Sequence, residues 1–148
     1  DKFGKILVPT DGSPSSTAAV HAAVALARAV NAALVFFHAF PVFHGGAYGT
    51  ADAARRQLAE AHEAAAKGAA ATILEPAMEL ARAAGVRSEA HVAESERPWE
   101  AIIAAAKRTR SDAICMGSHG RRGLAGVLLG SETARVLTHC TLPVLVIR

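Results

Sequence analysis

Short runs of apolar residues alternate along this chain with alanine-rich stretches in which apolar positions recur at helical spacing. Four of the runs are unbroken, as expected for strands buried on both faces of a parallel sheet. They lie at residues 6–8, 34–37, 113–116 and 144–147. A fifth segment, residues 87–93, alternates polar with apolar side chains, which is typical of an edge strand with one face in solvent. The pattern therefore predicts five strands.

Four helices are predicted between the strands. In the first, Ser13 is a suitable N-cap and Pro14 favours the first helical position. The third has Ser95 or Glu96 near its start. Pro76 lies inside the second helix, where it removes one backbone hydrogen bond, so we expect a kink or break just before it. The helices are predicted at residues 14–30, about 51–84, 98 to about 110, and 131–139.

Strands that alternate with helices in this way are typical of an α/β fold built on an open parallel sheet. The chain has 148 residues, of which 51% are hydrophobic. This length fits one domain spanning residues 1–148, because domains cluster at about 100 to 150 residues. A chain of this size buries enough apolar surface to fold without metal ions or disulfides.

The charge balance argues against a nucleic acid as partner. Sixteen Lys and Arg residues against thirteen Asp and Glu residues give a net charge of +3, but the basic residues are scattered and aromatic rings for base stacking are few. No apolar run reaches the ~18 residues that a membrane span requires, so no membrane association is expected. Cys115 and Cys140 lie in apolar segments without CxxC spacing, which favours a reducing, cytoplasmic compartment.

Two polar, glycine-bearing turns follow buried strands and are the places where a ligand is expected. Residues 9–13 follow the first strand, and residues 116–120 follow the fourth. In an open parallel sheet, ligands bind beyond the carboxyl ends of the strands. More glycines lead to Gly130 and Ser131 at the start of the fourth helix, where glycine backbone and helical N–H groups suit an anion. A phosphate-bearing ligand is therefore predicted here.

The spacing of these glycines identifies a family. It is not a Walker loop, because no Gly-Lys-Ser/Thr sequence occurs, and it is not GxGxxG. Gly117, two residues, Gly120, nine residues and the pair Gly130-Ser131 instead resemble the ATP-binding branch of the universal stress protein family. The resemblance extends over nearly the whole chain. It implies a five-stranded parallel sheet in the order 3-2-1-4-5 with helices on both faces, of the adenine nucleotide alpha hydrolase-like type. It also implies a homodimer paired through the last strand, Val144–Ile147.

The resemblance further implies a nucleoside pocket formed by three segments of the chain. Pro9, Thr10, Asp11 and Met116 would line it, with the Asp11 carboxylate near the ribose hydroxyls. The backbone of Ala39 would lie at the edge of the adenine. An acceptor carboxylate suits a diol, because both hydroxyls can donate to it.

The implied phosphate site lies next to this pocket. Gly117 would pack beside the ribose, and Gly120, Gly130 and Ser131 would surround the phosphates of ATP. The Ser131 hydroxyl would also be within reach of a Mg²⁺ ion carried by the phosphates. Glu132 departs from the small or apolar residue often found after that serine. Its carboxylate would disfavour phosphates if it pointed inward, whereas its backbone N–H can still donate.

Other polar residues support weaker hypotheses. His119 is interpreted as a positioning residue rather than a general base. Arg121 and Arg122 either hold phosphate or remain solvated. Ser13 is interpreted as a helix cap rather than a nucleophile. The seven histidines show no spacing that is typical of zinc ligands.

The leading hypothesis is therefore an ATP-binding homodimer that acts as a nucleotide-dependent regulator in the stress response. Hydrolysis is expected to be slow at most, because no Walker B acid or catalytic lysine is recognisable. One alternative is an interaction dimer of the same fold that binds no nucleotide. A second is an adenylating enzyme on a related fold, which would carry a serine-glycine phosphate loop or a His-x-Gly-His signature, and neither occurs here.

Overall fold

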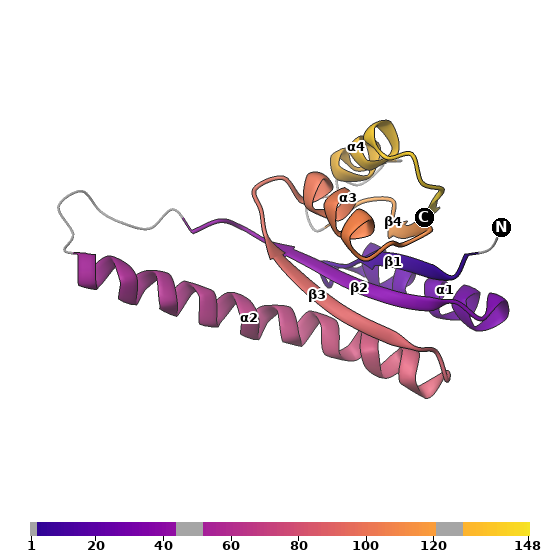
Figure 1. The fold of residues 1–148 in the computed structure, drawn as a ribbon, viewed down its shortest axis with the longest axis horizontal. Coiled ribbons are helices and arrows are strands. Elements are labelled where there is room, and N and C mark those ends of the chain that lie inside the picture. Colours follow the sequence, from indigo (N-terminus) through magenta and orange to yellow (C-terminus); the bar gives the residue numbers. More distant parts are fainter. Residues whose placement is uncertain (1–2, 44–51, 121–128) are drawn as a thin grey trace.

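A parallel sheet of five strands forms the centre of the computed structural model, which describes residues 3–43, 52–120 and 129–148 (Figure 1). The strands lie in the order β3-β2-β1-β4-β5, so the predicted fold class and strand order are confirmed. β1 and β4 are buried along almost their whole length, whereas β3 and β5 form the two edges. The strands are β1 (Lys5–Pro9), β2 (Ala33–Phe40), β3 (Ser88–Glu94), β4 (Ala113–Gly117) and β5 (Val144–Ile147).

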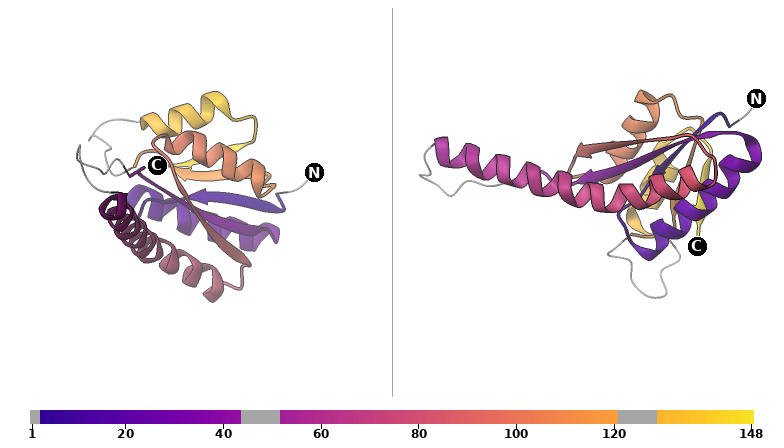
Figure 2. Two further views of the ribbon diagram at one scale, coloured as in Figure 1. Left: turned by 60° about the vertical axis from the view of Figure 1, so that its left-hand side comes forward. Right: turned by 90° about the horizontal axis from the view of Figure 1, so that it is seen from below.

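Helices cover both faces of the sheet (Figures 1 and 2). α1 and α2 lie on one face, where Ile6, Val8 and Phe36 point into a core with the alanines of α1. α3 and α4 lie on the other, where Leu7 and Phe37 point into a second core. Successive strand residues alternate between the faces, so the buried positions of the central strands are apolar on both sides. The helices are α1 (Pro14–Val30), α2 (Asp52–Ala83), α3 (Pro98–Arg108) and α4 (Ser131–His139).

α1 and α3 both begin at the predicted residues, Pro14 and Pro98. Ser13 is the N-cap of α1, and its hydroxyl accepts a hydrogen bond from the Ser16 N–H at 3.2 Å. Ser95 and Glu96 lie near the start of α3, as expected, and Arg97 is its N-cap residue, whose side chain makes no capping hydrogen bond. The Ser95 hydroxyl is used within its own turn, because it bonds the backbone of Arg97.

The sequence predicted a kink or a break before Pro76, and the break does not occur, because α2 runs without interruption through Pro76. Pro76 and Thr72, whose carbonyl loses its helical donor, both lie on the exposed side of the helix. Water can therefore satisfy that carbonyl. The first half of α2 extends past the sheet, as Figure 2 shows, and only its second half packs against the core. Within the described residues, no helix is both long and apolar enough to cross a membrane.

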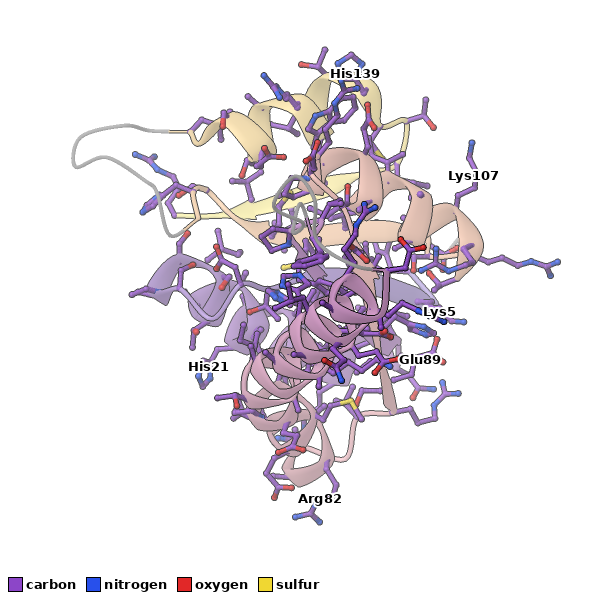
Figure 3. All side chains as sticks on the ribbon, turned by 90° about the vertical axis from the view of Figure 1, so that its left-hand side faces the viewer. Lys5, His21, Arg82, Glu89, Lys107 and His139 are labelled. Carbon is purple, nitrogen blue, oxygen red and sulfur yellow. The ribbon has the colours of Figure 1, made fainter. Side chains whose placement is uncertain are left out.

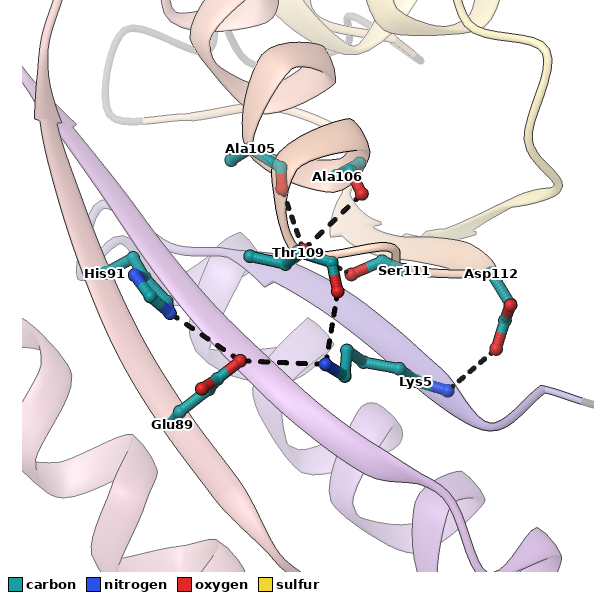
Figure 4. A network of polar contacts seen from close by, with 8 residues as sticks. All are labelled: Lys5, Glu89, His91, Ala105, Ala106, Thr109, Ser111 and Asp112. Carbon is teal, nitrogen blue, oxygen red and sulfur yellow. Dashed lines mark hydrogen bonds and ion pairs between the residues drawn. The ribbon is translucent and has the colours of Figure 1, made fainter.

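The carboxyl end of α3 is fixed by a side chain from β1 (Figure 4). The Lys5 ammonium donates to the Thr109 carbonyl oxygen at 3.1 Å and lies 3.9 Å from the Glu89 carboxylate. A cation at this position complements the helix dipole. Other polar side chains project into solvent: His21 and Arg82 from the layer of α1 and α2, and Lys107 and His139 from the opposite layer (Figure 3). Helices thus cover both faces of the sheet and leave open the side at which the strands end.

Candidate functional site

A cleft of about 670 Å³ lies at the carboxyl ends of β1, β2 and β4. This is the edge where ligands bind in open parallel sheets. All ten of the residues predicted for the site line this cleft, although they come from separate parts of the chain. They are Pro9, Thr10, Asp11, Ala39, Met116, Gly117, Gly120, Gly130, Ser131 and Glu132.

Sequence reasoning missed a second wall of the cleft. This wall follows β3 and includes the first residue of α3, Pro98. The position of β3 beside β2 was a usable signal, because the carboxyl ends of parallel strands meet at one edge of the sheet. The lining residues that were not candidates for the site are Ser16, Phe37, His38, Pro41, Ser95, Glu96, Pro98, Ile102 and Thr133.

The Asp11 carboxylate is held by the beginning of α1. Its Oδ1 accepts hydrogen bonds from the Ser13 N–H and the Ser16 hydroxyl, both at 2.9 Å. Ser16 is buried, so water does not compete for this contact. The other oxygen, Oδ2, faces the turn after β4, because a Cβ placed on Gly120 would lie 2.8 Å from it. The carboxylate is therefore oriented toward the cleft before any ligand is bound.

The backbone of Ala39 faces the same cleft. The Thr10 N–H donates to the Phe37 carbonyl at 2.8 Å, so the peptide groups of Phe37 point toward β1. Backbone groups alternate in direction along a parallel strand, and Ala39 has the same phase as Phe37. Since β1 ends at Pro9, the N–H and C=O of Ala39 point to where that strand has stopped.

His38 supports this arrangement from the neighbouring position. Its Nδ1 lies 2.9 Å from the Thr10 carbonyl oxygen. A carbonyl only accepts, so Nδ1 carries a proton in this contact. The ring therefore ties the end of β2 to the turn that follows β1.

Glycine is required by close packing at the end of β4. A Cβ on Gly117 would lie 2.8 Å from the carbonyl carbon of Ser15, in the first turn of α1. A Cβ on Gly130 would lie 2.9 Å from the Cα of His119. Both contacts are shorter than real Cβ atoms make, so the two glycines let three chain segments meet at the cleft. This requirement holds whether or not a ligand is bound.

The amino end of α4 opens into the cleft. Gly130 is its N-cap and provides no side-chain cap. The first helical hydrogen bond is from the Ala134 N–H to the Gly130 carbonyl at 3.0 Å, so the N–H groups of residues 131–133 have no helical acceptor. The Thr133 hydroxyl fixes this end to the sheet through the Gly117 carbonyl. The arrangement provides backbone donors and a positive dipole end for an anion.

The Glu132 side chain turns from α4 toward α3. Its Oε2 accepts a hydrogen bond from the Trp99 backbone N–H at 2.8 Å. Trp99 is the second residue of α3, so the carboxylate caps a helix that lacks a cap of its own. The sequence left open whether this carboxylate points inward, where it would disfavour phosphates. Glu132 does line the cleft, but the hydrogen bond to the Trp99 N–H directs its carboxylate to the amino end of α3.

The weaker candidates have different outcomes. His119 lines the cleft, with Nδ1 at 3.0 Å from the Ser118 hydroxyl. Arg121 and Arg122 lie outside the described residues. In the described part of the chain, no group of three or more His, Cys, Asp or Glu side chains is arranged to hold a metal ion.

Comparison with known proteins agrees with this geometry. The model of the family described as "Universal stress protein family" matches residues 2–148. The chain belongs to the universal stress protein family.

Other members of the universal stress protein family resemble this chain along its full length. A protein of Thermus aquaticus is 32% identical over 149 residues, and protein YxiE of Bacillus subtilis is 34% identical over 149 residues, in both cases with 99% of each chain covered. A universal stress protein solved in complex with cAMP superposes with a TM-score of 0.70 at 26% identity, covering 100% of this chain and 98% of that chain.

Proposed function

We propose that this protein binds adenine nucleotides in the cleft, ATP with Mg²⁺ in particular, and acts as a nucleotide-dependent homodimeric regulator in the stress response. The observation that carries the proposal is the convergence of Asp11, the Ala39 backbone and the open amino end of α4 around one cleft. Its volume of about 670 Å³ is typical of small-molecule sites, which occupy ~300–1,000 Å³.

The polar groups at the two ends of the cleft suggest how the ligand is oriented in it. Ala39 offers one N–H and one C=O, a pair that matches the donor and acceptor on the edge of an adenine. Asp11 offers an acceptor to ribose hydroxyls, and the 131–133 N–H groups offer donors to phosphate oxygens. The relative solved with cAMP supports an adenine nucleotide as the ligand class.

In this proposal Mg²⁺ enters bound to the phosphates. The Ser131 side chain is exposed at the first position of α4, so its hydroxyl is available to such an ion. Hydroxyl and phosphate oxygens are ligands that Mg²⁺ prefers. Binding, rather than rapid hydrolysis, is the activity that we propose.

The homodimer is proposed to form through β5. Leu145 on this edge strand is 44% exposed, whereas β3 at the opposite edge carries the charged residues Glu89 and Glu94. Apolar unpaired edges bind other strands, and charged edges resist it. We expect sedimentation equilibrium at tens of micromolar to give a dimer, Leu145→Lys to give a monomer, and the matched control Val92→Lys on β3 to remain dimeric. A wild-type monomer would contradict the proposal.

We also propose that residues 1–148 act as one domain in the cytoplasm. The two cores share the strands of one sheet, so neither can be separated from the other. Cys115 and Cys140 are both free thiols, which suits a reducing compartment.

Titration calorimetry with Mg-ATP on nucleotide-stripped protein tests the central proposal. We expect binding in the micromolar range and a loss of at least tenfold in Ser131→Glu, because the new carboxylate would stand where the phosphates bind. A carboxylate in the first turn of a helix is favourable, so this variant should fold. Thr17→Glu places the same charge in the first turn of α1, outside the cleft, and should bind as the wild type does.

Absence of heat with the wild-type protein would reject nucleotide binding and favour the interaction dimer. Equal affinities of wild type and Ser131→Glu would mean that the phosphates lie elsewhere. A phosphate-release assay on the same samples measures hydrolysis separately.

A further inference from the structure

The proposed nucleotide function uses the backbone N–H of Glu132 but gives no role to its side chain, which also lines the cleft. Glu132 belongs to the first turn of α4, next to Ser131, and its carboxylate reaches the Trp99 N–H at the first turn of α3. The amino ends of two helices thus share one carboxylate in the wall of the cleft. A carboxylate at this position lies near the positive ends of both helix dipoles.

The hydrogen bond to Trp99 orients the carboxylate without removing its charge. Asp11 and Glu96 line the same cleft, so Glu132 adds to a group of carboxylates at the site. An anionic ligand that binds at the amino end of α4 experiences repulsion from Glu132, and this repulsion grows with each negative charge on the ligand. A neutral nucleoside experiences almost none.

We infer that Glu132 is a specificity-determining residue, which makes the cleft select nucleotides by the charge of their phosphate groups. The inference rests on the proposed nucleotide function and refines it. Ligands of low phosphate charge, or a triphosphate neutralised by a divalent cation, are favoured over a bare triphosphate. Glu132 therefore makes the affinity for ATP depend on Mg²⁺ more strongly than the other contacts require.

The variant Glu132→Gln tests this charge effect with little change of shape. The glutamine amide oxygen can still accept the hydrogen bond from the Trp99 N–H, but the negative charge is lost. Trp99 is the single tryptophan of the chain, so its fluorescence reports whether the contact persists. Glu100→Gln is the matched control, because Glu100 lies in the first turn of α3, pairs with Arg97 and does not line the cleft.

The experiment compares adenosine, AMP and ATP without divalent cation, and then Mg-ATP, by calorimetry at low salt. In Glu132→Gln we expect the Kd for bare ATP to fall roughly three- to tenfold, that for AMP to fall less, and that for adenosine to change under about twofold. The increase in affinity for ATP that the variant shows should be smaller in the presence of Mg²⁺ and at high salt. Glu100→Gln should reproduce the wild-type values.

Two possible results distinguish a failure of this inference from a failure of the proposed function. If wild type binds the ligands but Glu132→Gln changes all four affinities by the same factor, Glu132 acts through structure and the inference is overturned while the proposed function stands. If neither protein binds any of the ligands, the proposed function fails and the inference fails with it.

Discussion

The hydroxyl of Thr133 donates a buried hydrogen bond to the carbonyl oxygen of Gly117, 2.9 Å away. Gly117 is the last residue of β4, and Thr133 lies in the first turn of α4. Fifteen residues separate the two in sequence, among them the glycines of the cleft. Because Thr133 is 2% exposed, water cannot replace this bond. It fixes the amino end of α4 relative to the sheet.

Thr133→Val should therefore lower both stability and nucleotide affinity. The valine has nearly the same shape, but the Gly117 carbonyl loses its side-chain donor, which costs about 1–3 kcal/mol in a buried site. Urea unfolding measures the loss of stability, and calorimetry measures the accompanying rise in the Kd for ATP. Thr133→Ser keeps the hydroxyl and serves as the control. A valine variant as stable as the wild type would show that this bond does not anchor α4.

The Asp11 carboxylate is predicted to bind the ribose hydroxyls of ATP. Asp11→Asn removes the charge, and an amide is a weaker acceptor for a ribose diol, so the Kd for ATP should rise about tenfold or more. Wild type and variant should bind 2′,3′-dideoxy-ATP equally, because this analogue lacks both hydroxyls. Calorimetry with ATP and 2′,3′-dideoxy-ATP on both proteins measures the coupling free energy between the Asp11 carboxylate and the ribose hydroxyls.

Asp11 also accepts hydrogen bonds from Ser13 and Ser16, so a structural effect must be separated from a ligand contact. An equal loss of affinity for both nucleotides would mean that Asp11 acts only by shaping the turn. Urea unfolding of the variant measures how far that turn is weakened.

The positions of the elements could be predicted from the sequence because burial leaves a direct signal. β1 and β4 are enclosed by helices on both faces, and an enclosed strand has to be an unbroken apolar run. The order of the strands had a different source. Nothing in the apolar run around Leu7 shows that β1 pairs with β2 on one side and β4 on the other, and the order came from the family resemblance.

Contacts between distant residues could not be predicted. Glu132 and Trp99 are 33 residues apart, and a carboxylate that bonds a backbone N–H requires no particular partner residue type. The same is true of His38 and the Thr10 carbonyl. Pro76 is the opposite case: its effect on a hydrogen bond was predictable, but the continuity of α2 depended on which side of the helix faces water.

Gly68 and Gly85 form a matched pair for a stability test. A Cβ at either position meets no atom within 4 Å, so the substitution creates no clash. Gly68 lies inside α2, where alanine should stabilise the protein by about 0.5–1 kcal/mol. Gly85 has a φ of +72°, where alanine should destabilise by about 1–2 kcal/mol. The unfolding temperature should therefore rise above that of the wild type in Gly68→Ala and fall below it in Gly85→Ala. Shifts of the same sign would contradict the assigned conformations.

Cys115 predicts a loss of stability in alkaline solution. Its thiol lies in β4 with its sulfur 3.7 Å from the Ala19 carbonyl oxygen, and burial raises its pKa from 9.0 to about 11. As pH rises from about 9 to about 11, the thiol of the unfolded chain loses its proton first. The unfolded state then binds fewer protons than the folded state, so the free energy of unfolding decreases across this interval.

Urea unfolding at pH 8 and pH 10.5 measures this effect, with Cys115→Ala as the control. The other titrating groups are the same in both proteins, so the wild type should lose more stability between the two pH values than the variant does. The raised pKa also predicts that a thiol reagent at neutral pH modifies the half-buried Cys140 first and reaches Cys115 only after unfolding. Equal pH dependence in wild type and variant would show that the Cys115 thiol does not differ between the folded and unfolded states.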